Sequence, residues 1–99
     1  MPHSITILGR KVPIKYISQE DLDKLIPGAA GVWSAYDRVI FVHKYAPKKI
    51  QRYIILHESV HVVFDITGLD QVIPAKLQEI CCQSIASLIE NILDQKWFK

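Results

Sequence analysis

The chain has few cysteines, little net charge and no long hydrophobic run, and each shortage argues against a class of protein. Its two cysteines, Cys81 and Cys82, are adjacent among 99 residues, which suits neither a disulfide framework nor a zinc finger. No segment approaches the roughly 20 apolar residues of a membrane-spanning helix. Residues 1–10 lack the basic start and apolar stretch of a signal peptide. We expect two free thiols and a cytoplasmic location.

The net charge of +2 is too small to indicate binding to nucleic acid or to an anionic membrane. Lys48, Lys49 and Arg52 gather locally, which is typical of a solvated helix face. Hydrophobic residues make up 49% of the chain, enough for a core, and disorder is not expected. The length predicts a single domain over residues 1–99.

The first half of the chain has the pattern of β-strands. Residues 4–8 and 12–16 are rich in strand-forming residues and predict a hairpin that turns at residues 9–11. Residues 32–36 and 39–43 predict a second pair. Between these pairs, Ser18 is typical of a helix N-cap, and Pro27 with Gly28 ends a short helix.

The second half predicts two long helices. One begins at Pro47 and ends near residue 67, before Gly68, and the other begins at Pro74 and ends near residue 94. Strands followed by helices indicate an α+β fold, with a small antiparallel or mixed sheet packed on a central helix and a second long C-terminal helix. The first helix is apolar around most of its circumference, as expected of a buried central helix.

A polar strip interrupts this apolar surface. His57, Glu58, His61 and Asp65 fall within a sector about 100° wide. Residues 57–61 form an H-E-x-x-H motif, in which imidazoles four residues apart share a helix face and can bind one zinc ion. Glu58 lies where it could accept a proton from a metal-bound water. The motif predicts a zinc metallopeptidase.

Catalytic zinc usually has three protein ligands, and Glu79 is the best third candidate. The first helix continues about 9 Å beyond His61, and the second returns about 7.5 Å from Pro74 to Glu79. Antiparallel packing would therefore bring Glu79 level with His61. The alternative is a solvent-exposed helix glutamate, and we treat Glu20 and Glu90 as such surface residues.

Other polar residues have more than one interpretation. Asp65 lies one turn after His61, where it fits a hydrogen-bond partner for an imidazole N–H or a surface carboxylate. His43, Tyr36 and Tyr45 are candidates for stabilising a tetrahedral intermediate, although each could be a strand-end or surface residue. Trp33 suits the core or a substrate platform, and the edge of the strand pair from Trp33 to Val42 could hold an extended peptide.

The chain resembles the small phage and prophage metallopeptidases related to the ImmA/IrrE proteins. Residues 7–16 (ILGRKVPIKY) are similar to their N-terminal hairpin, and residues 56–64 to their L-H-E-x-x-H helix. Residues 79–86 (EICCQSIA) are similar to their second-helix pattern E-x-x-A-N-x-F-A, with Cys82 and Gln83 at the Ala and Asn positions. The resemblance implies a zincin-like fold, zinc bound by His57, His61 and Glu79, and Glu58 as catalytic base.

Three functions follow as hypotheses. The first is zinc-dependent hydrolysis of a peptide or protein substrate, with Glu58 moving the proton. The second is a zinc-containing binding or regulatory module without turnover, against which the base at Glu58 argues. The third has no metal, with His57 and His61 as core histidines that find hydrogen-bond partners inside the protein.

Overall fold

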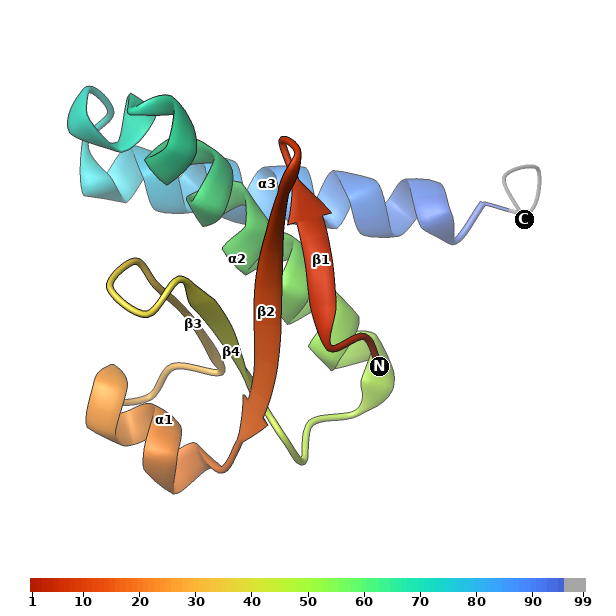
Figure 1. The fold of residues 1–99 in the computed structure, drawn as a ribbon. Helices are drawn as coiled ribbons and strands as arrows, with labels where there is room; N and C mark the ends of the chain where they lie inside the picture. The colour runs from red at the N-terminus through yellow and green to blue at the C-terminus, as the bar shows by residue number, and fades with distance from the viewer. Residues whose placement is uncertain (96–99) are drawn as a thin grey trace.

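A computed structural model describes residues 1–95 of the chain. It contains four strands, three α-helices and one short 3-10 helix (Figure 1). The strands are β1 (Ser4–Ile7), β2 (Arg10–Ile17), β3 (Gly31–Ser34) and β4 (Val39–His43). The helices are α1 (Gln19–Leu25), α2 (Lys48–Thr67), η1 (Leu69–Gln71) and α3 (Ala75–Leu93). The predicted order of strands followed by two long helices is confirmed, and the fold is α+β.

The strands form one mixed sheet in the order β1-β2-β4-β3. Strands β1 and β2 form an antiparallel hairpin, β2 and β4 run parallel, and β3 returns antiparallel to β4. The parallel pair needs a crossover, which α1 and β3 supply. Ser18 caps α1 as expected, since its hydroxyl oxygen accepts a hydrogen bond from the N–H of Asp21 at 3.2 Å. In the strand order β1-β2-β4-β3, β3 lies at one edge of the sheet.

The first hairpin turns one residue earlier, and through a loop one residue shorter, than the sequence predicts. Ile7 pairs with Arg10, so Leu8 and Gly9 alone form the loop. Both have positive φ angles, 50° and 78°, as a two-residue type I′ turn requires. This register buries Ile7 and Val12, while Leu8 stays exposed. The predicted turn at residues 9–11 is wrong because burial of these side chains decides the register.

Helix α2 is the central element of the fold, and its apolar circumference has a structural explanation. One side packs on the sheet, where Ile54, Ile55 and Val62 join buried strand residues in the main core. Another side packs against α3 through Val60 and Phe64, which form a second cluster with Cys82. The predicted buried central helix is confirmed, with the sheet and α3 as its two neighbours.

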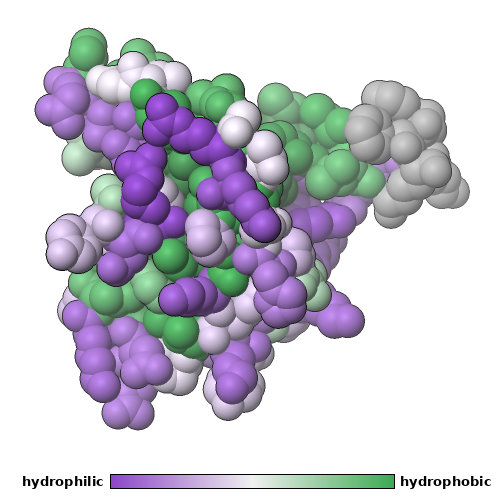
Figure 2. Space-filling view, viewed as in Figure 1, coloured by the Kyte–Doolittle hydropathy of each residue, from purple (hydrophilic) through white to green (hydrophobic). Residues whose placement is uncertain are grey.

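The chain reverses direction after α2 and returns along α3 (Figure 1). Gly68 ends α2 in the left-handed conformation, with φ 78°, and η1 leads into Pro74 at the start of α3. The side of α3 that faces α2 carries Cys82 and Ala86. Its outer side stays exposed and partly hydrophobic, as Figure 2 shows along this helix, and includes Leu77, Ile80, Ile85 and Leu88.

None of the helices within residues 1–95 has the length and apolar composition needed to cross a membrane. Cys81 and Cys82 are both free thiols, as expected from their adjacency. Cys82 is fully buried, and burial raises the pKa of its thiol to about 12.

Candidate metal centre

His57, Glu58 and His61 of the H-E-x-x-H motif lie together on one face of α2. This face is neither part of the main core nor fully open to solvent. Potential ligand atoms of His57, Glu58 and His61 all lie within 4.8 Å of one another. The two imidazole rings are one helical turn apart, with centroids separated by 5.3 Å. Both side chains are largely buried, with 13% and 21% of their surface exposed. The helical spacing therefore brings these three groups together, as the sequence predicts.

Glu79 of α3 reaches both imidazoles. Its Oε1 lies 2.8 Å from Nε2 of His57, and its Oε2 lies 3.1 Å from Nε2 of His61. The side chain is 47% exposed, yet each of its two carboxylate oxygens lies within hydrogen-bonding distance of a histidine. Helix α3 therefore returns Glu79 to the level of the motif, which is the geometry that the helix lengths predict.

Glu58 is held differently from Glu79. It is buried, and its Oε1 accepts a hydrogen bond from the backbone N–H of Trp33 at 2.9 Å. Its Oε2 lies 3.8 Å from Nε2 of His57. Burial raises the pKa of the Glu58 carboxyl, while the imidazoles of His61 and His57 and the Trp33 N–H oppose that rise. One oxygen of this carboxylate is thus anchored and the other is directed towards the site.

Gly31 allows strand β3 to approach α2 closely enough for this contact. A Cβ atom at Gly31 would lie 2.2 Å from Cγ2 of Ile54 and 3.5 Å from Cγ of Glu58. The first distance is far below van der Waals contact, so no larger residue fits without movement. Because Gly31 has no side chain, the edge of the sheet can lie this close to the helix that carries the motif.

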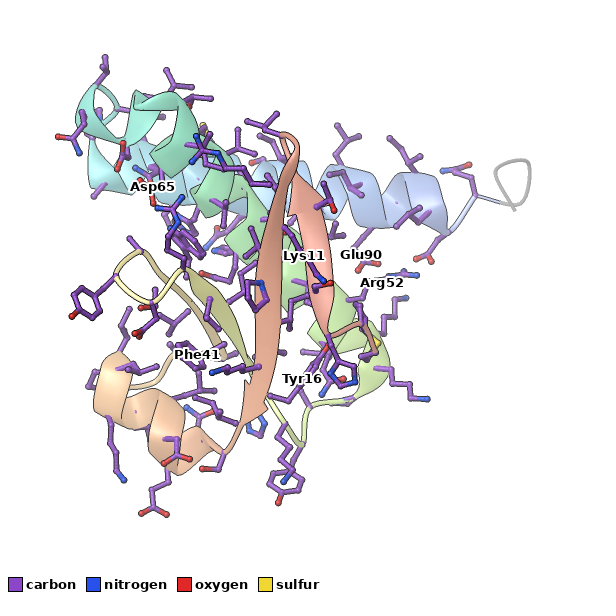
Figure 3. The ribbon with its side chains drawn as sticks, viewed as in Figure 1. Lys11, Tyr16, Phe41, Arg52, Asp65 and Glu90 are labelled. Atoms are coloured by element: carbon purple, nitrogen blue, oxygen red, sulfur yellow. The ribbon has the colours of Figure 1, made fainter. Side chains whose placement is uncertain are left out.

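Of the two roles predicted for Asp65, the hydrogen bond to an imidazole is wrong. Oδ2 of Asp65 accepts a hydrogen bond from the indole Nε1–H of Trp33 at 3.1 Å. The ring nitrogen Nδ1 of His61 lies instead 3.0 Å from Oε1 of Gln78, the residue before Glu79. Figure 3 labels Asp65 on α2, near the β3–β4 turn. Sequence spacing along α2 could not reveal Gln78, because that contact comes from the other helix.

A cleft of about 590 Å³ opens over these groups. Its walls come from β3 and the segment before it, from α2 and from the start of α3. Trp33 lines this cleft and packs against the main core, so both predicted roles are compatible with its position. The lining comprises Ile26, Ala29, Ala30, Gly31, Val32, Trp33, Ala35, Tyr53, Ile54, His57, Glu58, His61, Asp65, Asp70, Gln78 and Glu79.

The structure does not bring the predicted intermediate-stabilising residues into the cleft. Tyr36 and Tyr45 are 96% and 73% exposed, and Nδ1 of His43 accepts a hydrogen bond from the N–H of Tyr45. Among the described residues, the tyrosine in the cleft wall is Tyr53, with its ring 6.1 Å from that of His57. Tyr53 lies four residues before His57, so the helical period was a signal that could have found it.

Glu90 is not the surface residue that the sequence suggests. It is 8% exposed and forms a bidentate ion pair with Arg52, which also pairs with Asp94. Figure 3 shows Arg52 and Glu90 pointing towards each other from α2 and α3. The partner stands 38 residues earlier in the chain, so no local pattern shows it. Arg52 likewise belongs to this pair rather than to a freely solvated basic face.

Comparison of the chain with protein-family models, with curated proteins and with solved structures found no match. The candidate centre therefore stands on its own geometry.

Proposed function

We propose that the protein is a zinc-dependent peptidase with a zincin-like site, in which His57, His61 and Glu79 bind the metal and Glu58 is the catalytic base. The observation that carries the proposal is the position of the Glu79 carboxylate. Its two oxygens lie 2.8 and 3.1 Å from the Nε2 atoms of the two motif histidines. A third ligand of the same metal must lie close to both rings, and Glu79 does so.

The donor set fits zinc. Two imidazole nitrogens and one carboxylate are a common ligand combination for catalytic zinc, and they leave a position open for water. Magnesium and calcium prefer shells made of oxygen alone, which two histidines do not provide. Glu58 adds a second carboxylate within 4.8 Å of the histidines, but the Trp33 N–H already engages one of its oxygens. The hydrogen bond from Trp33 to Glu58 therefore favours Glu79 as the ligand and Glu58 as the base.

A zinc ion bound there would supply Lewis acidity, lowering the pKa of a water molecule and polarising the carbonyl of the substrate. Glu58 would accept the proton of the attacking water through Oε2, since Oε1 is occupied by Trp33. Glu58 would then pass the proton to the leaving amine. The phenol of Tyr53 in the cleft wall is the candidate hydrogen-bond donor to the substrate oxygen.

The cleft suits an extended peptide. It is open, and one wall is the edge strand β3, to which a peptide can add by main-chain hydrogen bonds. The N–H of Trp33 is already used by Glu58, so a bound peptide would have to pair with other backbone groups of β3. A cytoplasmic peptide or protein substrate agrees with the resemblance to the ImmA/IrrE-related metallopeptidases.

The test combines metal analysis with turnover. Protein purified without a histidine tag should contain about one zinc per chain, and it should cleave members of a mixed peptide library or an unfolded protein. Glu58→Gln should keep the fold and the zinc but lose on the order of 10² to 10⁴ in rate. Glu20→Gln, on the exposed first turn of α1, is the matched control and should keep both.

Three outcomes would contradict the proposal. Absence of a stoichiometric transition metal after growth with zinc would exclude the metal centre. Undiminished turnover by Glu58→Gln would assign the base to another group. If wild type and Glu58→Gln bound the same partner equally well and neither cleaved it, the chain would be a zinc-containing binding module.

A further inference from the structure

Both ring nitrogens of His61 face neighbouring residues of α3. Nδ1 lies 3.0 Å from Oε1 of Gln78, and Nε2 lies 3.1 Å from Oε2 of Glu79. Adjacent residues on a helix point about 100° apart, so a single turn of α3 holds the imidazole from two directions. His57 is placed differently, with Glu79 at its Nε2 and the ring of Tyr53 beside it.

The amide oxygen of Gln78 can only accept a hydrogen bond. It therefore favours a proton on Nδ1 of His61, which leaves Nε2 to bind a metal. Without a metal, Nε2 faces the carboxylate of Glu79, which also only accepts, so the lone pair on Nε2 is expected when zinc lies between the two. A metal binds the unprotonated nitrogen, so this tautomer is the one the proposed centre requires. Bonds of this kind to the second ring nitrogen also fix the orientation of a ligating imidazole.

We propose that Gln78 is a positioning residue, which holds His61 in the tautomer and orientation needed to bind zinc through Nε2. The inference rests on the proposed function, because it presupposes a metal at the His57, His61 and Glu79 site. It goes beyond that function in assigning a specific task to a residue that neither binds the metal nor belongs to the motif.

If Gln78 had a purely structural role, its loss would have a different effect. Gln78 is half-buried at the α2–α3 contact, and its loss could merely loosen the packing of the two helices. Such loosening would lower stability without selecting a protonation site on one histidine. The tautomer of His61 is therefore the deciding measurement.

The experiment compares Gln78→Leu, which removes the acceptor, with Gln78→Glu, which retains one. Gln83→Leu is the control, since Gln83 is exposed on the same helix. Zinc affinity is measured by competition with a chromophoric chelator. The histidine tautomers are read in zinc-loaded protein from long-range proton–nitrogen correlations of the imidazoles, with thermal unfolding as the test of folding.

We expect Gln78→Leu to bind zinc about 10- to 100-fold more weakly, as is common when the partner of a ligating histidine is removed. Its His61 signals should lose the pure Nδ1–H pattern, while those of His57 keep theirs. Gln78→Glu should restore both the affinity and the tautomer, and Gln83→Leu should match wild type.

The outcomes separate this inference from the proposed function. Equal affinity and an unchanged His61 tautomer in Gln78→Leu would overturn the role of Gln78 and leave the peptidase standing. Zinc binding that depends on Gln78, in a protein that cleaves nothing, would support the role and reject the peptidase. A wild-type protein that binds no metal would overturn both.

Discussion

The backbone N–H of Trp33 donates a hydrogen bond to Oε1 of Glu58 across 2.9 Å, joining the edge strand β3 to helix α2. A second bond from the same residue, its indole N–H to Asp65, lies two turns further along the helix. Trp33 is therefore fixed to α2 at both ends, through its main chain and its side chain. The orientation of the proposed base depends on where the sheet ends as well as on the helix that carries it.

Gly31→Ala should destabilise the protein and disturb the Glu58 contact. The added Cβ would lie 2.2 Å from Cγ2 of Ile54, and overpacking of this kind costs about 1–3 kcal/mol. Urea unfolding measures the loss. Ile54→Ala removes the clashing atom, so the double variant should be less destabilised than the sum of the single variants. Additive losses would show that the backbone of β3 moves away and that Ile54 does not limit its approach.

Glu79→Gln should weaken zinc binding more than Glu20→Gln. The amide keeps the shape of the side chain but lacks the anionic charge of a ligand, whereas Glu20 is exposed on α1 and should not affect the metal. Competition with a chelator gives both affinities. Equal metal retention in the two variants would assign the third ligand elsewhere, with Asp65 and Asp70 of the cleft wall as the next residues to substitute.

Arg52→Met should lower stability without changing metal affinity. The substitution leaves the carboxylate of Glu90 buried without its cationic partner, and we expect a measurable loss of stability, reduced because Arg52 itself is partly exposed. Arg52→Met combined with Glu90→Leu should recover much of that loss, because no charge is then buried. Thermal unfolding gives the stability, and zinc titration of each variant checks the site. A double variant as unstable as Arg52→Met would contradict this explanation.

Native protein should expose only one of its two thiols to alkylation. Cys82 is fully buried, and the pKa of its thiol is raised to about 12, so little thiolate forms at pH 8 to 9. Cys81 is partly exposed. Iodoacetamide followed by mass spectrometry should show one fast modification, lost in Cys81→Ser and kept in Cys82→Ser, and two in denaturant. Fast modification of Cys82 in the folded state would show that α3 separates readily from α2.

The sequence predicts the elements of this fold well because local rules govern them. The cap at Ser18, the stop at Gly68 and the helix start at Pro74 depend on single residues and their neighbours. The hairpin formed by β1 and β2 was predicted, but the position of its turn was not, because Leu8 adopts a φ of 50° that local preference does not favour. Its conformation follows from burial of Ile7 and Val12, which is a property of the assembled core.

The candidate site likewise has one part that the sequence predicts and another part that depends on how the elements pack. His57, Glu58 and His61 share a face by helical period alone, and the approach of Glu79 follows from two helix lengths. The contacts of Trp33 and Gln78 depend on how closely β3 and α3 approach α2, which no spacing within one helix encodes. Binding of zinc, and turnover, stay predictions.

Helix α3 packs on the rest of the protein chiefly through α2, and Glu79 lies near the start of that contact. A ligand that bridges the two helices would bind only when they are docked. Its binding energy would then add to their docking, by about 2.7 kcal/mol at a free zinc concentration one hundred times the dissociation constant. Removal of zinc should therefore speed amide hydrogen exchange in α3 more than in the sheet. Bound metal would hold α3 against α2. The metal content of the protein would then determine how often the hydrophobic inner side of α3 becomes exposed to solvent.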